Sequence, residues 1–184
     1  MEREWNYLLH LIRCAIHDNL PNEVPDDVDL QRVYECGVYH HIANLAFYSV
    51  ERLKDPPSGD LYDSWKACRD KALVLDINQS FAAEEIRTAF RSANIHWLEM
   101  QGTKIKPIYP QSDWRTMTDI DFIVDADKLQ QAGDILHGLG YACKNIRDTE
   151  IVGFRAPNIQ VELHVGLWAE NSAYYDVLTD AYSS

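Results

Sequence analysis

Two aspartates separated by one residue, Asp119 and Asp121, lie in the apolar segment DIDFIVD. Residues two apart on a β-strand project from the same face with Cα atoms about 6.8 Å apart, so both carboxylates can reach one small volume. The intervening apolar residues then take the opposite, buried face. Two carboxylates about 4 Å apart repel each other by roughly 4 kcal/mol at an effective dielectric constant near 20. The pair therefore favours a shared proton or a bound cation, and Mg²⁺ or Mn²⁺ suits such oxygen ligands.

A third acid, Glu162, lies in the later segment IQVELHV. Gln160, Glu162 and His164 alternate with apolar residues and therefore share one face of a strand. If this strand lies beside DIDFIVD at the usual spacing of about 4.8 Å, Glu162 supplies a third carboxylate, as a metal ligand or as a base for an attacking hydroxyl. For His164, a phosphate contact, orientation of Glu162 and a structural role are all consistent with the pattern. Because the chain has 29 acidic residues, the aspartate spacing can also arise among structural acids.

The stretch before the aspartates, MQGTKIKPIYPQSDWRT, contains a glycine turn followed by several cationic residues. Gly102 permits a tight turn, and Thr103 offers a hydroxyl and a backbone N–H group. Positive charge is available from three residues of the stretch: Lys104, Lys106 and Arg115. Simple solvation is the alternative for the lysines, and pairing with Asp113 or Asp119 is the alternative for Arg115.

The N-terminal part of the chain predicts helices. Apolar residues recur at helical spacing from Trp5 until Pro21 and Pro25, and a second helical segment covers residues 30–53. We expect Gly37 to divide or weaken this second segment. It contains His40 and His41, and adjacent histidines on a helix point about 100° apart, which favours surface or packing roles over a shared metal.

The segment KDPPSGD is the clearest break in the chain, because two prolines and a glycine cannot continue a helix. It divides a predicted N-terminal helical segment, residues 1–57, from a core, residues 58–184. A long helix follows, with an apolar seam from Leu61 to Ala93 that is interrupted at Gln79. A coiled-coil partner is possible for such a helix, but we favour packing against a sheet and the N-terminal helices.

The remaining pattern predicts an α+β fold. Strands are expected at IHWLEM, DIDFIVD, YACKNIR, IVGFRA and IQVELHV. A helix over residues 129–139, with Asp125 or Asp127 as its cap, separates the second and third strands. A last amphipathic helix is expected over residues 173–182.

Composition excludes several classes of protein. A formal net charge of −12 disfavours broad nucleic-acid binding, which depends on Lys and Arg contacts to phosphate. The four cysteines are too scattered for a zinc or thiol redox motif. Because no signal peptide and no apolar run of membrane-spanning length is recognised, we expect a cytoplasmic protein that does not bind a membrane.

The spacing of these residues resembles the nucleotidyltransferase superfamily typified by DNA polymerase β. The closest likeness is to a bacterial branch of uncharacterised nucleotidyltransferases, which has a Lys-Gly turn, a Tyr-Pro, an Arg, an Asp-Ile-Asp and a later Glu-x-His strand. The matching residues here are Gly102, Tyr109-Pro110, Arg115, Asp119-Ile120-Asp121 and Glu162-Leu163-His164. Gln101 stands where the branch usually has Lys, and Gly102-Thr103 replaces the superfamily's Gly-Gly or Gly-Ser.

The resemblance implies a mixed sheet of about four or five strands flanked by helices. It also implies transfer of a nucleoside monophosphate from an NTP to an acceptor hydroxyl, with loss of pyrophosphate. Asp119, Asp121 and Glu162 would then hold two Mg²⁺ or Mn²⁺ ions, with Glu162 also acting as the base. The nucleotide-binding residues would be Gly102, Thr103, Lys104, Arg115 and His164.

The acidic surface indicates a small molecule or a protein side chain as the acceptor. A catalytically silent member of the same fold that binds a nucleotide or a partner protein is the main alternative, and a metal-dependent phosphohydrolase is a third. The identity of the NTP and the oligomeric state do not follow from the sequence.

Overall fold

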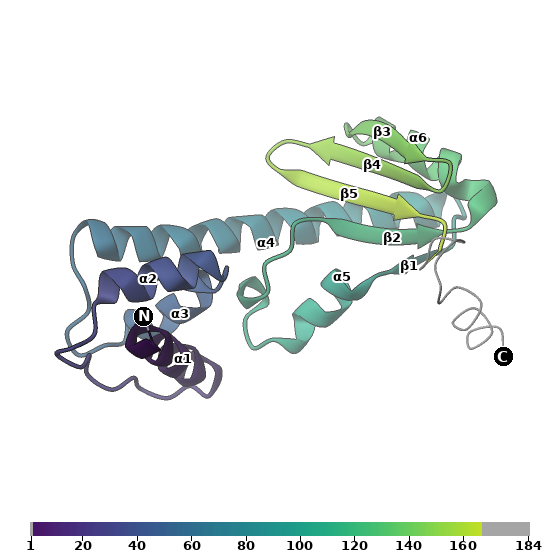
Figure 1. Cartoon of the computed structure of the whole chain (residues 1–184). Helices are drawn as coiled ribbons and strands as arrows, with labels where there is room; N and C mark the ends of the chain where they lie inside the picture. Colours follow the sequence, from purple (N-terminus) through teal and green to yellow (C-terminus); the bar gives the residue numbers. More distant parts are fainter. Residues whose placement is uncertain (1, 167–184) are drawn as a thin grey trace. The chain divides into compact units, whose positions relative to one another are not determined.

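A computed structural model describes residues 2–166 of the chain, in two compact units (Figure 1). Unit 1 consists of the chain up to Asn78 together with Ile105–Thr116, and unit 2 consists of Gln79–Lys104 and the chain from Met117 onward. The sequence-based division at residues 57 and 58 stays a prediction. The helix expected over residues 173–182 lies outside the described residues.

Unit 1 is helical, as its apolar spacing predicts. It contains α1 (Glu2–Ile16), α2 (Leu30–Tyr39), α3 (Ala43–Val50) and the first part of α4 (Asp60–Ser92). Two short 3-10 helices, η1 (Lys106–Ile108) and η2 (Ser112–Trp114), belong to the same unit. Its core is one buried cluster that includes Leu8, Leu11, Val33, Phe47 and Trp65.

The break between α2 and α3 corrects the expectation about Gly37. The glycine lies inside α2, where a Cβ atom would come within 3.2 Å of the Ala43 Cα atom, so it serves close packing between the two helices. The helix ends at Tyr39, with His40 as its C-cap and His41 at a φ of 57°. The two histidines therefore lie in the turn and not within a helix, and both are exposed.

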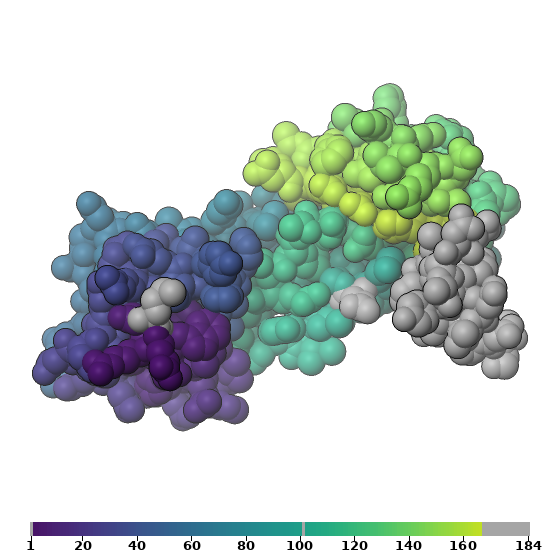
Figure 2. Space-filling model, viewed as in Figure 1, coloured from purple at the N-terminus to yellow at the C-terminus, as the bar shows by residue number. Residues whose placement is uncertain are grey.

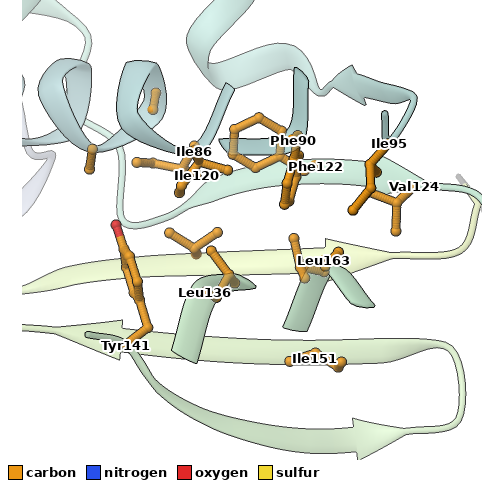
Figure 3. Close-up of a cluster of buried hydrophobic side chains, with 14 of the residues drawn as sticks. Ile86, Phe90, Ile95, Ile120, Phe122, Val124, Leu136, Tyr141, Ile151 and Leu163 are labelled. Atoms are coloured by element: carbon orange, nitrogen blue, oxygen red, sulfur yellow. The ribbon is translucent and has the colours of Figure 1, made fainter. Parts of the chain in front are cut away.

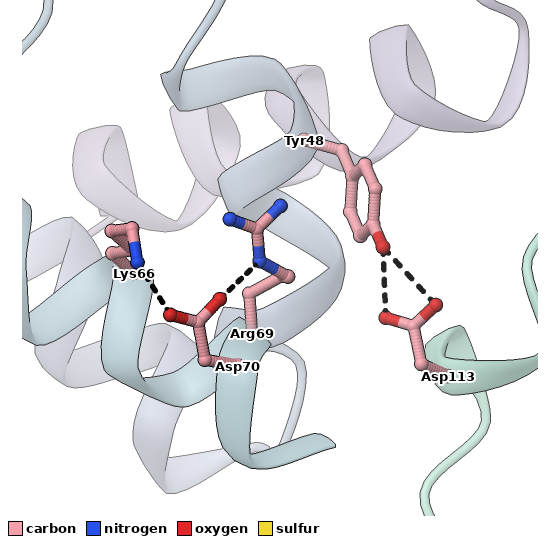
Figure 4. A network of polar contacts seen from close by, with 5 residues as sticks. All are labelled: Tyr48, Lys66, Arg69, Asp70 and Asp113. Carbon is pink, nitrogen blue, oxygen red and sulfur yellow. Dashed lines mark hydrogen bonds and ion pairs between the residues drawn. The ribbon is translucent and has the colours of Figure 1, made fainter. Parts of the chain in front are cut away.

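Polar contacts connect α3 with η2 in unit 1, and a separate group of ion pairs lies within α4 (Figure 4). The Tyr48 hydroxyl donates to both carboxylate oxygens of Asp113, at 3.1 and 3.0 Å, and the Asn44 side chain donates to the Asp113 carbonyl. Burial raises the pKa of Asp113. Because these groups lie far apart in the sequence, their hydrogen bonds fix η2 against α3.

Unit 2 is built on a five-stranded mixed sheet, which confirms the predicted α+β fold. Its strand order is β1-β2-β5-β4-β3. Only the pair formed by β2 and β5 is parallel among the described strands, and the other neighbours are antiparallel. The bounds are β1 (Trp97–Glu99), β2 (Ile120–Val124), β3 (Ala142–Arg147), β4 (Glu150–Arg155) and β5 (Ile159–His164).

One face of this sheet is covered by the second part of α4 and by α6 (Leu129–Gly138). Figure 3 shows the resulting core, in which Ile86 and Phe90 of α4 pack against Ile120 and Phe122 of β2. The predicted burial of the apolar residues of β2 is confirmed. The predicted helix cap by Asp125 or Asp127 is not observed. Neither the η3 segment (Ala126–Lys128) nor α6 has a side-chain cap hydrogen bond.

Gln79, the polar interruption in the seam of α4, has a defined partner. Its side chain is 2% exposed and donates to the Met117 carbonyl at 3.0 Å. A buried amide is tolerated when it is hydrogen-bonded, so the residue anchors the chain that leads into β2. No helix among the described residues is long and apolar enough to cross a membrane.

Candidate metal and nucleotide site

The parallel pairing of β2 with β5 confirms the adjacency expected for the acidic strands. Asp121 is the register partner of Glu162. Ile120 and Phe122 point into the core on one side, so Asp121 and Glu162 project from the face that α4 and α6 leave uncovered, which we call the open face. Both acids are half-buried. The alternating pattern of each strand thus places two carboxylates side by side.

His164 joins the two carboxylates on the open face. Its Nε2 atom lies 3.4 Å from Asp121 Oδ1 and 3.4 Å from Glu162 Oε2. A hydrogen bond with Asp121 is the main cause that raises the pKa of His164, and nearby carboxylates add to it. Ligand atoms of Asp121, Glu162 and His164 all lie within 4.8 Å of one another, which suits a metal ion. The histidine is therefore part of the acidic group.

Glu162 has a second neighbour to which the sequence assigned no role. Gln160 Nε2 donates to Glu162 Oε1 at 2.7 Å, while His164 lies beside the other carboxylate oxygen. Both contacts come from residues two positions away on β5, the spacing that places side chains on one strand face. The alternation of IQVELHV is the signal that could have identified Gln160 as an orienting residue.

Asp119 has a different position from Asp121. It is half-buried and precedes β2, which begins at Ile120. The described group that could hold a metal contains His164 and does not contain Asp119. Its role as a ligand stays a prediction.

The stretch around Gly102 is a short helix, α5 (Gln101–Ile105), where the sequence predicts a turn. Hydrogen bonding connects its start to the acidic strand, because the Met100 N–H group donates to the Asp121 carbonyl at 3.1 Å. A Cβ atom on Gly102 would lie 2.6 Å from Met117 Sδ, so the glycine allows close packing of this residue. Lys104 is exposed.

Glu99, the last residue of β1, is paired with Arg87 of α4 and lies near Thr103 of α5. Arg87 donates to both Glu99 carboxylate oxygens, at 2.6 and 2.8 Å. The Arg87 hydrogen bonds are the main cause that lowers the pKa of Glu99, and a hydrogen bond from the Thr103 side chain contributes in the same direction. The Thr103 hydroxyl also donates to the Met100 carbonyl at 3.5 Å, which ties it to the residue before α5.

We expect the Arg87–Glu99 pair to make unit 2 sensitive to acid. Because the folded-state pKa of Glu99 is lowered, its contribution to stability is present above the unfolded-state value and is lost as pH falls through the folded-state value. At pH 7, the unfolding free energy of Glu99→Gln should be about 1–3 kcal/mol below that of the wild type. Acidification from pH 7 to pH 3 should lower the unfolding free energy of the variant less than that of the wild type. Urea denaturation at both pH values measures this. The expectation is wrong if the wild type and Glu99→Gln lose the same unfolding free energy between pH 7 and pH 3.

The other two cationic candidates lie in unit 1. Arg115 is half-buried and follows η2, and its Nε atom has no hydrogen-bond partner among the described residues. Lys106 is 6% exposed and forms an ion pair with Asp76, with its Nζ atom 2.6 Å from Asp76 Oδ1. This pair argues against a phosphate contact by Lys106, while the role of Arg115 stays a prediction.

Comparison with known proteins identifies one match. A family model with the description "Uncharacterised nucleotidyltransferase" matches residues 26–184. No curated protein and no solved structure matches the chain. The match covers α2 to α6 and all five strands.

Proposed function

Because the chain belongs to this family of uncharacterised nucleotidyltransferases, we propose that it moves a nucleoside monophosphate from an NTP to a hydroxyl group, in a reaction that depends on a divalent metal ion. The observation that carries the proposal is the group formed by Asp121, Glu162 and His164 on neighbouring parallel strands. The acceptor is a small molecule or a protein side chain, since a net charge of −12 disfavours a nucleic acid.

The donor set fits a divalent metal ion. Asp121 and Glu162 offer carboxylate oxygens, the ligands that Mg²⁺ and Mn²⁺ prefer, and Asp119 is the expected third acid. A neutral His164 would favour Mn²⁺ over Mg²⁺, because imidazole suits transition metals. When bound, the ion would supply positive charge that stabilises the phosphoryl group under transfer and the pyrophosphate that leaves.

Glu162 is the proposed base for the acceptor hydroxyl. Gln160 holds one of its oxygens at 2.7 Å and His164 lies 3.4 Å from the other, so the carboxylate has a fixed orientation. Fixed orientation of the groups around the reacting atoms is a large part of catalysis in phosphoryl transfer. The oxygen beside His164 is the one proposed to accept the proton.

The proposed phosphate contacts come from the start of α5, while a contact by Arg115, which lies in unit 1, stays a prediction. Gly102, Thr103 and Lys104 lie in α5, whose preceding residue is hydrogen-bonded to the backbone of Asp121. The Thr103 backbone N–H and the Lys104 ammonium are the groups we propose for the triphosphate. The Thr103 hydroxyl is less suited because it already donates to the Met100 carbonyl at 3.5 Å.

One observation favours a second candidate, a silent member that binds a nucleotide or a partner protein without catalysis. The imidazole of His164 lies between the two carboxylates, and its raised pKa lets an imidazolium supply part of the positive charge expected of a metal. Pyrophosphate release separates the two functions.

The first test is a thermal-shift panel of the four NTPs with Mg²⁺ or Mn²⁺. A ligand at 100 times its Kd stabilises the folded state by about 2.7 kcal/mol, so we expect at least one NTP to raise Tm by about 5–10 °C when metal is present. Release of pyrophosphate with candidate acceptors then identifies an enzyme. If no NTP raises Tm with either metal, the proposal is wrong.

A further inference from the structure

The face of the sheet that carries the acidic group continues to the edge strand β3, although Val152 of β4 is buried on it, at 6% exposure. Register partners point to the same side, so Asp121, Glu162, Val152 and Lys144 form one row across β2, β5, β4 and β3. Cys143, the residue before Lys144, has its Sγ atom 3.8 Å from the Gly133 carbonyl of α6. Since adjacent strand residues face opposite sides, Lys144 projects from the open face.

A second row on this face ends in another cation. His164 pairs with Glu150, and Glu150 pairs with Arg147 of β3. Lys144 and Arg147 are both exposed, and neither forms an ion pair with another residue in the part of the chain that the structure describes. Figure 2 shows β3 to β5, in green to yellow, at the outer surface of unit 2. The open face is thus acidic at β2 and β5 and basic at β3.

In this arrangement, the NTP and the acceptor would approach the acidic group from different sides. The residues proposed for the triphosphate precede β2 and lie in α5, which follows edge strand β1. Glu162, the proposed base, lies on the other side of Asp121, with β4 and β3 beyond it. An acceptor whose hydroxyl approaches Glu162 from that side passes above the buried Val152 and reaches the exposed Lys144 of β3.

We propose that Lys144 binds an anionic group, a phosphate or a carboxylate, on the acceptor. This inference rests on the proposed function. Lys144 stands two strands from Glu162, about 10 Å between Cα atoms, and its flexible four-carbon stem lets the ammonium group reach back over Val152. An acceptor that carries a hydroxyl and an anionic group a few bonds apart fits this span. Arg147 adds positive charge at the same edge, although Glu150 is its register partner.

A plain alternative is that Lys144 protects an edge strand from pairing with other chains, as lysines often do. Only the first role predicts that Lys144 contributes to the binding of an anionic ligand. We would saturate the protein with Mn²⁺ and a non-hydrolysable analogue of the NTP that gives the largest thermal shift. Glycerol 3-phosphate, glycerate and glycerol are then titrated by calorimetry, as phosphate, carboxylate and neutral probes.

We expect at least one anionic probe to bind the wild type more tightly than glycerol does, by about 10-fold or more, and more weakly as salt is added. Lys144→Gln should remove most of this advantage, and the matched variant Lys128→Gln, which lies in η3 after β2, should keep it. Comparison of the two anionic probes tells phosphate from carboxylate.

Two results would overturn the inference. One is equal binding of all three probes to the wild type, and the other is an undiminished preference in Lys144→Gln. Either result would leave the proposed function intact, because the thermal shift caused by NTP and metal is measured first. Absence of that shift would refute the proposed function and this inference together.

Discussion

Replacing Asp121 with asparagine is expected to abolish the stabilisation by NTP and metal and to lower the rate of pyrophosphate release by about 100-fold or more. Asp121 is the register partner of Glu162, and its Oδ1 atom lies 3.4 Å from His164 Nε2. It therefore neighbours both other residues of the proposed metal-binding group. Asparagine keeps the shape but removes the charge that holds a divalent cation. A loss of about 3 kcal/mol in transition-state stabilisation corresponds to the expected factor.

The unliganded variant gives the control for misfolding. Asp121→Asn removes one of two adjacent carboxylates but keeps an oxygen that can face His164, so its Tm without ligand should stay close to that of the wild type. Asp125→Asn makes the same chemical change at an exposed position just after β2 and should respond to NTP and metal as the wild type does. If Asp121→Asn keeps the full thermal shift, the metal assignment is wrong.

The strands of the site could be predicted because their patterns are local. The alternation in DIDFIVD and IQVELHV determines which side chains face the core, and the structure confirms both patterns. Parallel pairing of these two strands is not local, since α6, β3 and β4 lie between them in the sequence. The expectation that Glu162 lies beside Asp121 therefore depended on the chemistry of the acids and on the family resemblance.

The errors arose where tertiary contacts override local preference. Gly37 lowers helix propensity, yet it lies inside α2 because Ala43 packs against it, and the chain turns at His41 instead. Gly102 lies in a short helix, where Met117 leaves no room for a Cβ atom. Lysine is usually exposed, so the sequence could not show that Lys106 would be buried with Asp76.

That buried pair leads to the second large expected effect, on stability. The side chains of Lys106 and Asp76 are 7% and 10% exposed and lie 2.6 Å apart, and the Ser112 hydroxyl donates to the other oxygen of Asp76. Asp76→Ala should destabilise unit 1 by about 3–5 kcal/mol, because it leaves a buried ammonium group without its counter-ion. The unfolding free energy is measured by denaturant titration, with hydrogen exchange of α4 peptides as the readout of unfolding.

Two comparisons show whether burial is the cause. Lys54 and Glu23 form an ion pair of the same length, 2.6 Å, but their side chains are 74% and 70% exposed, so Lys54→Ala should cost less than about 1 kcal/mol. The double variant Asp76→Leu with Lys106→Met replaces both charges by apolar groups and should recover most of the stability lost in Asp76→Ala. If the double variant is as unstable as the single one, the cost comes from lost packing and not from an unpaired buried charge.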